Sequence, residues 1–216
     1  PLFNMSYSVG QIHKYSVDLY GRLEEETGQY AGLSRVSNIR LATTQDRMDE
    51  YKQYAGVAQT IGVQVDILTP DEVVDIWPLA VKDNLIGAIR HPMDGYIQPA
   101  DLTQALAKGA RDIGGQIYRN TNVTAITRTP SGEWKVTTDK GEVICEHVVS
   151  ATGNFARRTG EMVGLDIPVI PVEHQYIVTE PHPAIQERQA KGLPEMGVLR
   201  ESCLLYTSPS PRDGTK

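Results

Sequence analysis

The stretch EVICEHVVSATGNFARRTGEMVG, residues 142–164, is the part of this sequence that decides the fold. Its first half holds the apolar residues Val143, Ile144, Val148 and Val149. The small residues Ser150, Ala151, Thr152 and Gly153 follow, and then a helical pattern. This order predicts a buried strand, a tight glycine turn and the start of a helix. Such a turn can bring backbone N–H groups close to a phosphate or a cofactor ring, although an ordinary strand-to-helix turn fits the same pattern.

The composition indicates a globular protein with a sizeable core. The chain has 216 residues, of which 40% are hydrophobic and 22% charged, so it is long enough for one large domain or two small ones. The formal net charge is -6, and basic residues interleaved with aromatic residues do not occur as a run. We therefore expect no nucleic-acid partner.

Cysteine usage and hydropathy bear on the cellular compartment of the protein. The two cysteines, Cys145 and Cys203, provide neither a disulfide framework nor the spacing of metal ligands, so we expect a reducing compartment and no metal. No apolar run approaches the length of a membrane span. The start, PLFNMSYSVG, lacks an initiator methionine and a signal pattern, so we expect the chain to begin inside a longer protein. The expected location is the cytoplasm, or the mitochondrial matrix if the source is eukaryotic.

The sequence predicts alternating helices and strands before residue 91, and a helix followed by antiparallel strands after it. The first part predicts a helix ending at Gly28, a strand at 37–44, a helix from Thr44 to about Gly62, a strand at 63–68 and a short helix opened by Pro70. The middle predicts a turn at 93–95, a helix at 98–114, a short strand at 116–119 and three antiparallel strands within 121–129, 133–139 and 142–153.

Three longer motifs then carry a family resemblance: HPMDGYIQPADLTQALAKGAR at 91–111, VVSATGNFARRTGEMVGL at 148–165 and IPVIPVEHQYIVTEP at 167–181. The combination resembles the flavin-dependent amine oxidoreductases of the D-amino-acid-oxidase superfamily, most closely the dimethylglycine and sarcosine dehydrogenase branch. LEEETG at 23–28 and SNIRLATT at 37–44 also resemble that branch. The resemblance runs from about Met5 to about Arg200.

The resemblance implies an α/β fold with an α+β substrate part. An incomplete FAD-binding domain, Rossmann-like and of the glutathione-reductase type, would be interleaved with a substrate domain built on a mixed or antiparallel sheet. We assign residues 1–90 and 166–202 to the substrate domain and 91–165 to the FAD-binding domain. Family members begin with a GxGxxG turn that holds the FAD pyrophosphate, and some carry a histidine bonded to the flavin. This sequence has neither, so we expect that part to precede Pro1.

The resemblance also implies cofactor contacts in two places. Val123 matches the position whose backbone faces the adenine, and Ala151, Thr152 and Gly153 match a second dinucleotide contact, where small side chains let the main chain approach. From pattern alone, Val123 is equally a plain core valine. Arg157 and Arg158 could neutralise the diphosphate, or they could belong to a solvated helix face.

His174 is the predicted catalytic residue. It lies in VIPVEHQYIVTE, residues 169–180, on one face of a predicted strand with mainly apolar neighbours. The family's corresponding histidine borders the amine pocket, where a neutral imidazole could accept a proton from the substrate ammonium or orient its carboxylate. Pattern alone also fits a core histidine. His91, Tyr96 and Tyr176 are predicted to line the same substrate pocket, with surface turn positions as the alternative for His91 and Tyr96.

The end of the chain has a different composition. Residues 203–216, with Ser202 as the alternative start, follow no helical or strand period, and we expect them to be foreign to the fold, with a genuine disordered tail as the alternative.

The predicted function is removal of hydride from an N-methylated amine or amino acid to FAD, followed by iminium hydrolysis. The partners would be a small amine and an electron acceptor, oxygen or an electron-transfer protein, which the sequence does not distinguish. One alternative is another amino acid or a hydroxy acid as substrate. A second is an inert binding module.

Overall fold

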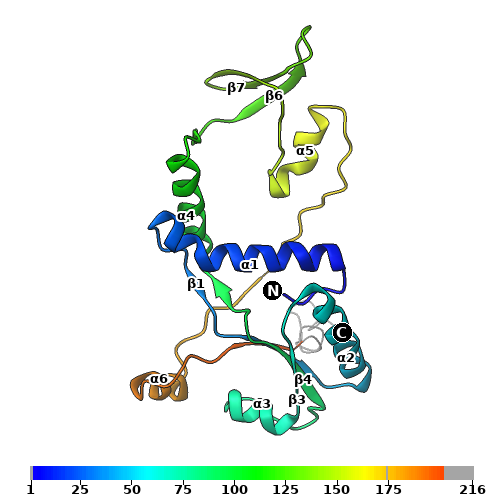
Figure 1. Ribbon diagram of the computed structural model, residues 1–216, viewed down its shortest axis with the longest axis vertical. Helices are drawn as coiled ribbons and strands as arrows, with labels where there is room; N and C mark the ends of the chain where they lie inside the picture. Colours follow the sequence, from blue (N-terminus) through cyan, green and yellow to red (C-terminus); the bar gives the residue numbers. More distant parts are fainter. Residues whose placement is uncertain (1, 174, 202–216) are drawn as a thin grey trace, which may run out of the picture. The chain divides into compact units, whose positions relative to one another are not determined.

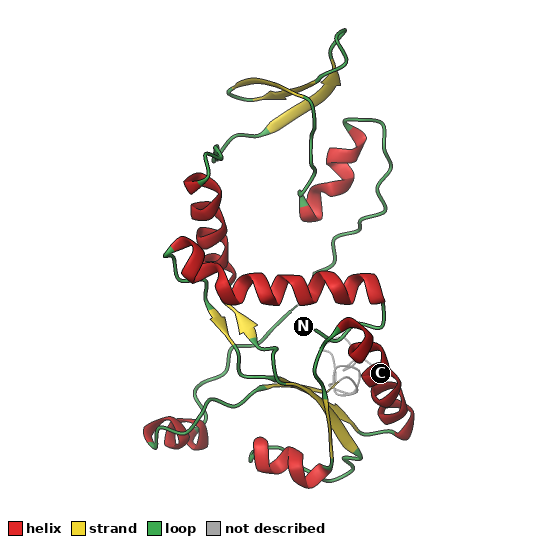
Figure 2. Cartoon of the chain, in the orientation of Figure 1, coloured by secondary structure: helices red, strands yellow, loops and turns green. Residues whose placement is uncertain are grey.

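Packing divides the chain into two compact units. A computed structural model describes residues 2–173 and 175–201. The first unit comprises the described residues up to Gly115 and from His182 onward, and the second comprises those between Gln116 and Pro181. Both units mix helices and strands (Figures 1 and 2), as the predicted combination of α/β and α+β structure requires.

The first unit is built on a four-stranded mixed sheet. Its strands are β2 (Asn38–Ala42), β3 (Asp66–Leu68), β4 (Gly87–His91) and β9 (Val198–Glu201). Their order in the sheet is β3-β4-β2-β9, with β2 and β9 parallel and the other pairs antiparallel. A second, two-stranded sheet pairs β1 (Leu33–Ser34) with β5 (Tyr96–Ile97).

Helices cover both faces of the four-stranded sheet. The helices of this unit are α1 (Tyr7–Thr27), α2 (Gln45–Ile61), α3 (Pro70–Ile76), α4 (Pro99–Asp112) and α6 (Pro183–Ala190). On one face, Tyr51 and Tyr54 of α2 pack with Ile89 of β4. On the other face, Val73 of α3 packs with Ile39 of β2. Figure 1 shows α2 and α3 on either side of β4. The sheet is therefore buried on both faces, and α1 packs against α4 and against α2.

The predicted helix ends of the first half are confirmed. Gly28 and Gly62 end α1 and α2 in the left-handed conformation, at φ +65° and +75°. The Thr44 hydroxyl accepts a hydrogen bond from the Arg47 backbone N–H at the start of α2. Pro70 is the first residue of α3. Local capping chemistry therefore fixes these boundaries as the sequence indicated.

The second unit is an antiparallel meander followed by a short helix. The strands are β6 (Val123–Arg128), β7 (Trp134–Thr138) and β8 (Gly141–Cys145), in that order in the sheet. The 3₁₀ helix η1 (Gly153–Phe155) and α5 (Ala156–Glu161) follow. The predicted three-stranded meander is thus confirmed, with one turn between Arg128 and Trp134 and the other between Thr138 and Gly141.

Three predicted strands differ from the structure. The buried strand expected in 142–149 is an exposed strand that ends at Cys145, and Val149 beyond it is 88% exposed. Residues 116–119 form no strand, and neither do the described residues of 169–180. β8 pairs with β7 on one edge only, and the segment after Cys145 and the other two segments have no partner strand among the described residues, so the apolar pattern lacks the surface that would bury it.

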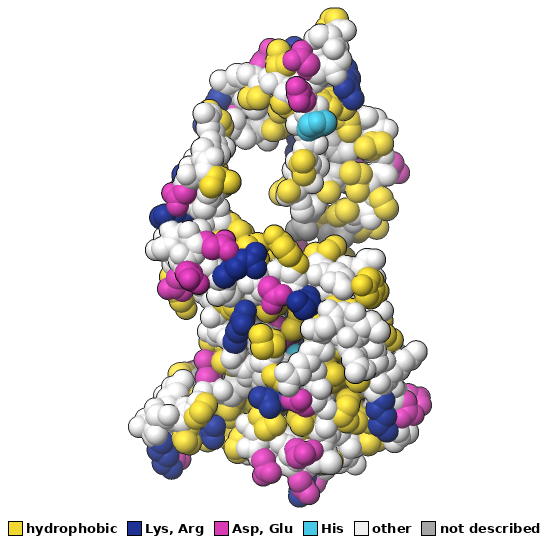
Figure 3. All heavy atoms as spheres, in the orientation of Figure 1, with side chains coloured by type: hydrophobic (Ala, Val, Ile, Leu, Met, Phe, Trp, Pro, Cys, Tyr) yellow, Lys and Arg dark blue, Asp and Glu magenta, His cyan; other side chains and the backbone are white. Residues whose placement is uncertain are grey.

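The second unit has almost no core of its own. Among its described residues, Ile126 is the one buried hydrophobic side chain. Figure 3 shows hydrophobic side chains on the surface over the region that Figure 1 labels α5. The first unit, by contrast, holds three buried clusters.

The two units do not coincide with the predicted substrate and cofactor parts. They are defined by packing, and α4, which we assigned to the cofactor part, packs on α1 in the first unit. The functional division stays a prediction. No helix in the described ranges is both long and apolar enough to cross a membrane.

Candidate functional site

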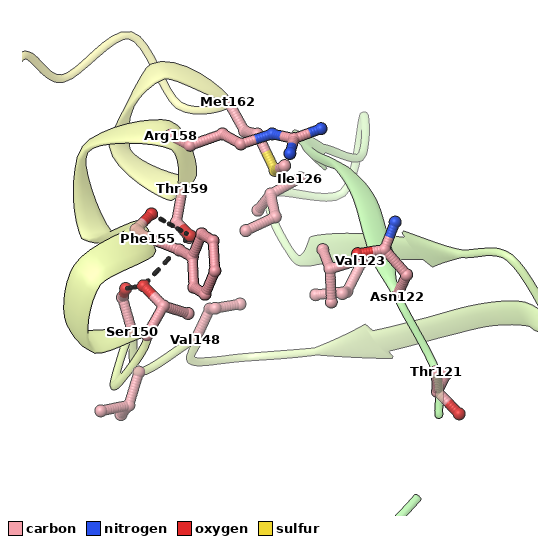
Figure 4. Close-up of a pocket in the computed structure, with 13 residues that line it drawn as sticks. Thr121, Asn122, Val123, Ile126, Val148, Ser150, Phe155, Arg158, Thr159 and Met162 are labelled. Atoms are coloured by element: carbon pink, nitrogen blue, oxygen red, sulfur yellow. Dashed lines mark hydrogen bonds between the residues drawn. The ribbon is translucent and has the colours of Figure 1, made fainter. Parts of the chain in front are cut away.

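A cavity in the second unit lies between the meander and α5. It has a volume of about 430 Å³ (Figure 4). The lining residues come from the start of β6, the segment after β8 and the helix, and they are Thr121, Asn122, Val123, Ile126, Val136, Val148, Val149, Ser150, Thr152, Phe155, Arg158, Thr159 and Met162. A smaller cavity of about 310 Å³ shares Ile126, Val148, Ser150 and Thr159 with it. The wall is apolar, with hydroxyl groups along one side.

Two of the four predicted cofactor residues meet at this cavity. Val123 opens β6, and Thr152 precedes η1, so the fold brings the meander and the glycine turn to one place. Ala151 and Gly153 flank Thr152 in the chain without lining the cavity themselves. The alternative of a plain core valine does not fit Val123, which is 36% exposed. Whether these residues contact a cofactor stays a prediction.

Short contacts fix the glycine turn to the helix. The Thr152 hydroxyl oxygen lies 3.1 Å from that of Ser150 and 3.1 Å from that of Thr159. The Phe155 backbone N–H donates to the Thr152 carbonyl at 3.0 Å. Figure 4 shows Ser150, Phe155 and Thr159 on the same side of the cavity. The turn therefore holds its hydroxyls at the cavity wall.

Gly153 is required by its backbone conformation. Its φ is +53°, in the left-handed region, and a Cβ built there would meet no atom within 4 Å. Space is thus available at this position, and the constraint is the backbone angle.

The two arginines of α5 have different surroundings. Arg157 lies 3.6 Å from Glu161 and 3.6 Å from Asp166, so its charge is paired. Arg158 lines the cavity and forms no ion pair within the described part of the chain. Of the two, Arg158 is the one placed to neutralise an anionic group in the cavity.

These features fit part of a dinucleotide cofactor. The cavity volume lies in the range of roughly 300–1,000 Å³ typical of small-molecule sites. Its apolar wall suits a flat ring, and its hydroxyls and Arg158 suit ribose and phosphate groups. The described residues contain no group of three or more His, Cys, Asp or Glu side chains that could hold a metal ion.

His91, predicted at the substrate pocket, is a core residue. Its side chain is fully buried on β4, packed against the rings of Phe3 and Tyr54. Its Nε2 lies 3.4 Å from the Tyr54 hydroxyl, which donates to the Leu2 carbonyl at 2.9 Å. Burial lowers the pKa of His91 to about 4, so the imidazole is neutral at pH 7. The surface-turn alternative is wrong for His91, because the strand carries it into the core.

The remaining predicted substrate residues are spread over both units. Tyr96 is 46% exposed on β5, and its hydroxyl donates to Glu195 at 2.9 Å. Tyr176 is 84% exposed in the second unit and lies outside any strand or helix. His174 lies outside the described residues. The shared substrate pocket stays a prediction.

Sequence reasoning missed two groups of residues. Phe155 and Met162 line the cavity, and their apolar character beside the glycine turn was the available signal. Arg40 and Asp94 lie near His91, and a charged residue inside the strand 37–44 was a signal for Arg40.

The chain is similar to a family of flavoenzymes, to two mitochondrial dehydrogenases and to a solved oxidase structure. The family described as FAD dependent oxidoreductase matches residues 4–215. Rattus norvegicus mitochondrial dimethylglycine dehydrogenase is 38% identical over 98% of this chain, which spans 24% of that protein. Homo sapiens mitochondrial sarcosine dehydrogenase is 33% identical over 76% of the chain and 18% of its own length. The crystal structure of glycine oxidase from Geobacillus kaustophilus matches with a TM-score of 0.64 and 32% identity, covering 76% of this chain and 45% of that one.

Proposed function

Because this chain belongs to the FAD dependent oxidoreductase family, we propose that the full-length protein containing it oxidises an N-methylated amine or amino acid with FAD. The predicted resemblance and fold class are confirmed by the family match and by the likeness to glycine oxidase. The chain spans 24% of the length of the dimethylglycine dehydrogenase it matches, so the activity belongs to a larger protein.

The observation that carries the proposal is the cavity between the meander and the glycine turn. Val123 and Thr152 border it from two segments that are distant in the sequence, and Arg158 adds a positive charge without an ion-pair partner among the described residues. In this proposal, Val123 and the turn at Ala151, Thr152 and Gly153 contact the dinucleotide, and Arg158 neutralises its phosphate charge.

The proposed reaction is an oxidative demethylation. FAD supplies the oxidising chemistry, since it takes up the hydride removed from the carbon bonded to the amine nitrogen. Water then adds to the substrate iminium, which breaks down to an aldehyde, a demethylated amine and a proton. The protein must desolvate and orient the amine and hold it unprotonated, so that the nitrogen lone pair assists hydride departure. We assign proton acceptance to His174.

The names of the relatives support the substrate class. Two are dehydrogenases of dimethylglycine and sarcosine, and the solved structure is a glycine oxidase. We therefore propose a small N-methylated amino acid as the substrate. The electron acceptor, oxygen or an electron-transfer protein, is left open by the cavity and its lining.

The test uses the full-length protein and its flavin absorbance. We expect bound FAD after purification, and bleaching of the flavin when dimethylglycine or sarcosine is added without oxygen. Glycine and glycerol 3-phosphate serve as controls for the amino-acid and hydroxy-acid alternatives. Bleaching by one of these controls alone would change the substrate class. A colourless protein that stays colourless with added FAD would remove the enzyme assignment.

We predict that His174→Ala slows flavin reduction by the amine about 10²-fold with FAD still bound, the lower end for a lost acid–base group. The pH dependence of reduction should also change, because an ionisable side chain is lost. The control is His147→Ala, which removes an exposed histidine of the second unit. A core role for His174 gives the opposite result, a less stable variant that reduces its flavin at the original rate.

A further inference from the structure

Arg40 is a half-buried cation in the first unit that forms no ion pair with the described residues. It lies in the middle of β2, and its guanidinium carbon is 4.4 Å from the centre of the Phe3 ring. Its Nε is buried and has no hydrogen-bond partner within 2–173 and 175–201. A buried donor without a partner is costly, so such a group needs a physical explanation.

A second arginine lies beside Arg40 on the neighbouring strand. In the parallel pair of β2 and β9, Arg40 is in register with Arg200, so both side chains leave the same face of the sheet. Burial lowers the pKa of Arg40, and the positive charge of Arg200 lowers it further. Like Arg40, Arg200 forms no ion pair in the part of the chain that the structure describes. Two like charges on adjacent strands repel each other unless an anion lies between them.

The carboxylate that acts on Arg40 is that of Asp94, and the two side chains form no ion pair. Asp94 is buried, and its two oxygens accept from the backbone N–H groups of Leu2 and Gly95, each at 2.9 Å. It acts on Arg40 only as a nearby charge, and raises the Arg40 pKa. The charged side chains that act on Arg40 are Arg200 and Asp94, so together with Arg40 itself they sum to about +1, which one carboxylate would balance and a doubly charged phosphate would exceed.

We infer that Arg40 and Arg200 together form a binding site for the carboxylate group of a small molecule. The planar guanidinium fork matches the two oxygens of a carboxylate, and Arg40 would gain the partner that its Nε lacks. Arg200 is exposed, so a ligand can approach from that side. The inference rests on the sheet register and on the contacts of Arg40, and does not depend on the proposed oxidase or dehydrogenase function.

The chain offers a matched control in Arg90. This arginine lies on the neighbouring strand β4 and also has a buried Nε without a hydrogen-bond partner in the described ranges. However, its guanidinium lies 3.8 Å from Asp66, and its register partner Ile39 places it on the opposite face of the sheet from Arg40. Arg90 therefore has a counterion already and should not respond to added carboxylate.

The test measures whether acetate stabilises the first unit of the full chain against urea. Trp77 fluorescence reports this unit once Trp134→Phe has removed the tryptophan of the second unit. Acetate is compared with chloride at equal ionic strength. At an acetate concentration ten times its Kd, we expect the unfolding constant to fall about tenfold relative to chloride. Formate should act in the same way.

The variants separate a built site from a general salt effect. Arg200→Gln, at an exposed position, should remove the acetate effect, and Arg40→Lys should weaken it because the fork geometry is lost. Arg90→Lys should leave the effect unchanged. An equal acetate effect in Arg200→Gln, or no difference between acetate and chloride, would overturn the inference. Stronger stabilisation by inorganic phosphate than by acetate would overturn the carboxylate assignment.

Discussion

At the scale of single residues, Gly153 shows how one backbone angle shapes the candidate cofactor site. Its φ of +53° is strained for a β-branched side chain, although a Cβ at this position would meet no atom within 4 Å. We predict that Gly153→Val in the full-length protein lowers the FAD content, because the turn must move away from its present path. The measurement is the ratio of flavin to protein absorbance after purification.

Gly153→Asn is the control for this prediction. Asparagine tolerates the left-handed region better than valine, so this variant should keep most of its FAD. An unchanged flavin content in Gly153→Val would mean that the turn does not contact the cofactor.

The buried His91 side chain should make the stability of the first unit depend on pH. Its pKa is about 4 in the folded chain, whereas an unfolded histidine titrates near 6.5, because burial disfavours the charged ring. Between these values the unfolded state binds one more proton. The free energy of unfolding should therefore be highest above pH 6.5 and fall by about 3 kcal/mol as the pH falls to 4.

The check is urea unfolding followed by Trp77 fluorescence across this pH range. His91→Phe keeps an aromatic ring beside Phe3 and Tyr54 and should remove this part of the pH dependence. His147→Gln, at an exposed position, should retain it. Identical pH profiles for the original chain and His91→Phe would show that His91 does not cause the slope.

At the scale of elements, α3 is held by reciprocal capping. The Thr69 hydroxyl accepts from the Glu72 backbone N–H at 3.4 Å, and the Glu72 carboxylate accepts from the Thr69 backbone N–H at 2.8 Å. Hydrogen bonds from the Thr69 backbone N–H and hydroxyl lower the pKa of the exposed Glu72 carboxyl. The helix in turn buries Val73 against the sheet.

We predict that Thr69→Ala lowers the free energy of unfolding of the first unit by about 0.5–2 kcal/mol, the usual cost of a lost N-cap. Thr60→Ala is the matched control, since Thr60 is an exposed residue inside α2 whose hydroxyl donates to the Val57 carbonyl. Both variants are compared by urea unfolding. An equal loss in the two variants would mean that the capping box adds nothing.

At the scale of the whole molecule, the two units differ in how much apolar surface they bury. The first unit has three hydrophobic clusters, whereas Ile126 is the one buried hydrophobic side chain among the described residues of the second. Exposed apolar side chains of the second unit include Val149, Phe155, Ile170, Val172 and Ile177. An exposed surface of this kind favours aggregation.

We therefore predict that the 216-residue chain expressed alone is aggregation-prone and binds FAD weakly or not at all. Limited proteolysis should cut within residues 116–181 before it cuts the first unit. Size-exclusion chromatography and flavin absorbance provide the measurement. A monomeric yellow protein with stoichiometric FAD and one cooperative melting transition would contradict the prediction.

The sequence by itself determined the local features of this protein. Short-range turn and capping chemistry, which neighbouring residues carry, sets the helix ends at Gly28 and Gly62, the start of α3 at Pro70 and the meander. The family was also readable, because its motifs are spread over nearly the whole chain.

Only the tertiary structure decided which predicted residues meet. It placed His91 in a core, left the apolar run at Val148 and Val149 without a covering strand among the described residues, and brought Arg40 beside Arg200 across β2 and β9. Burial and charge pairing depend on residues far away in the sequence, and a period of two or 3.6 indicates a face without indicating what covers it. The sheet register supplied that missing information for the two arginines, because it joins a strand near the start of the chain to one near the end of the described residues.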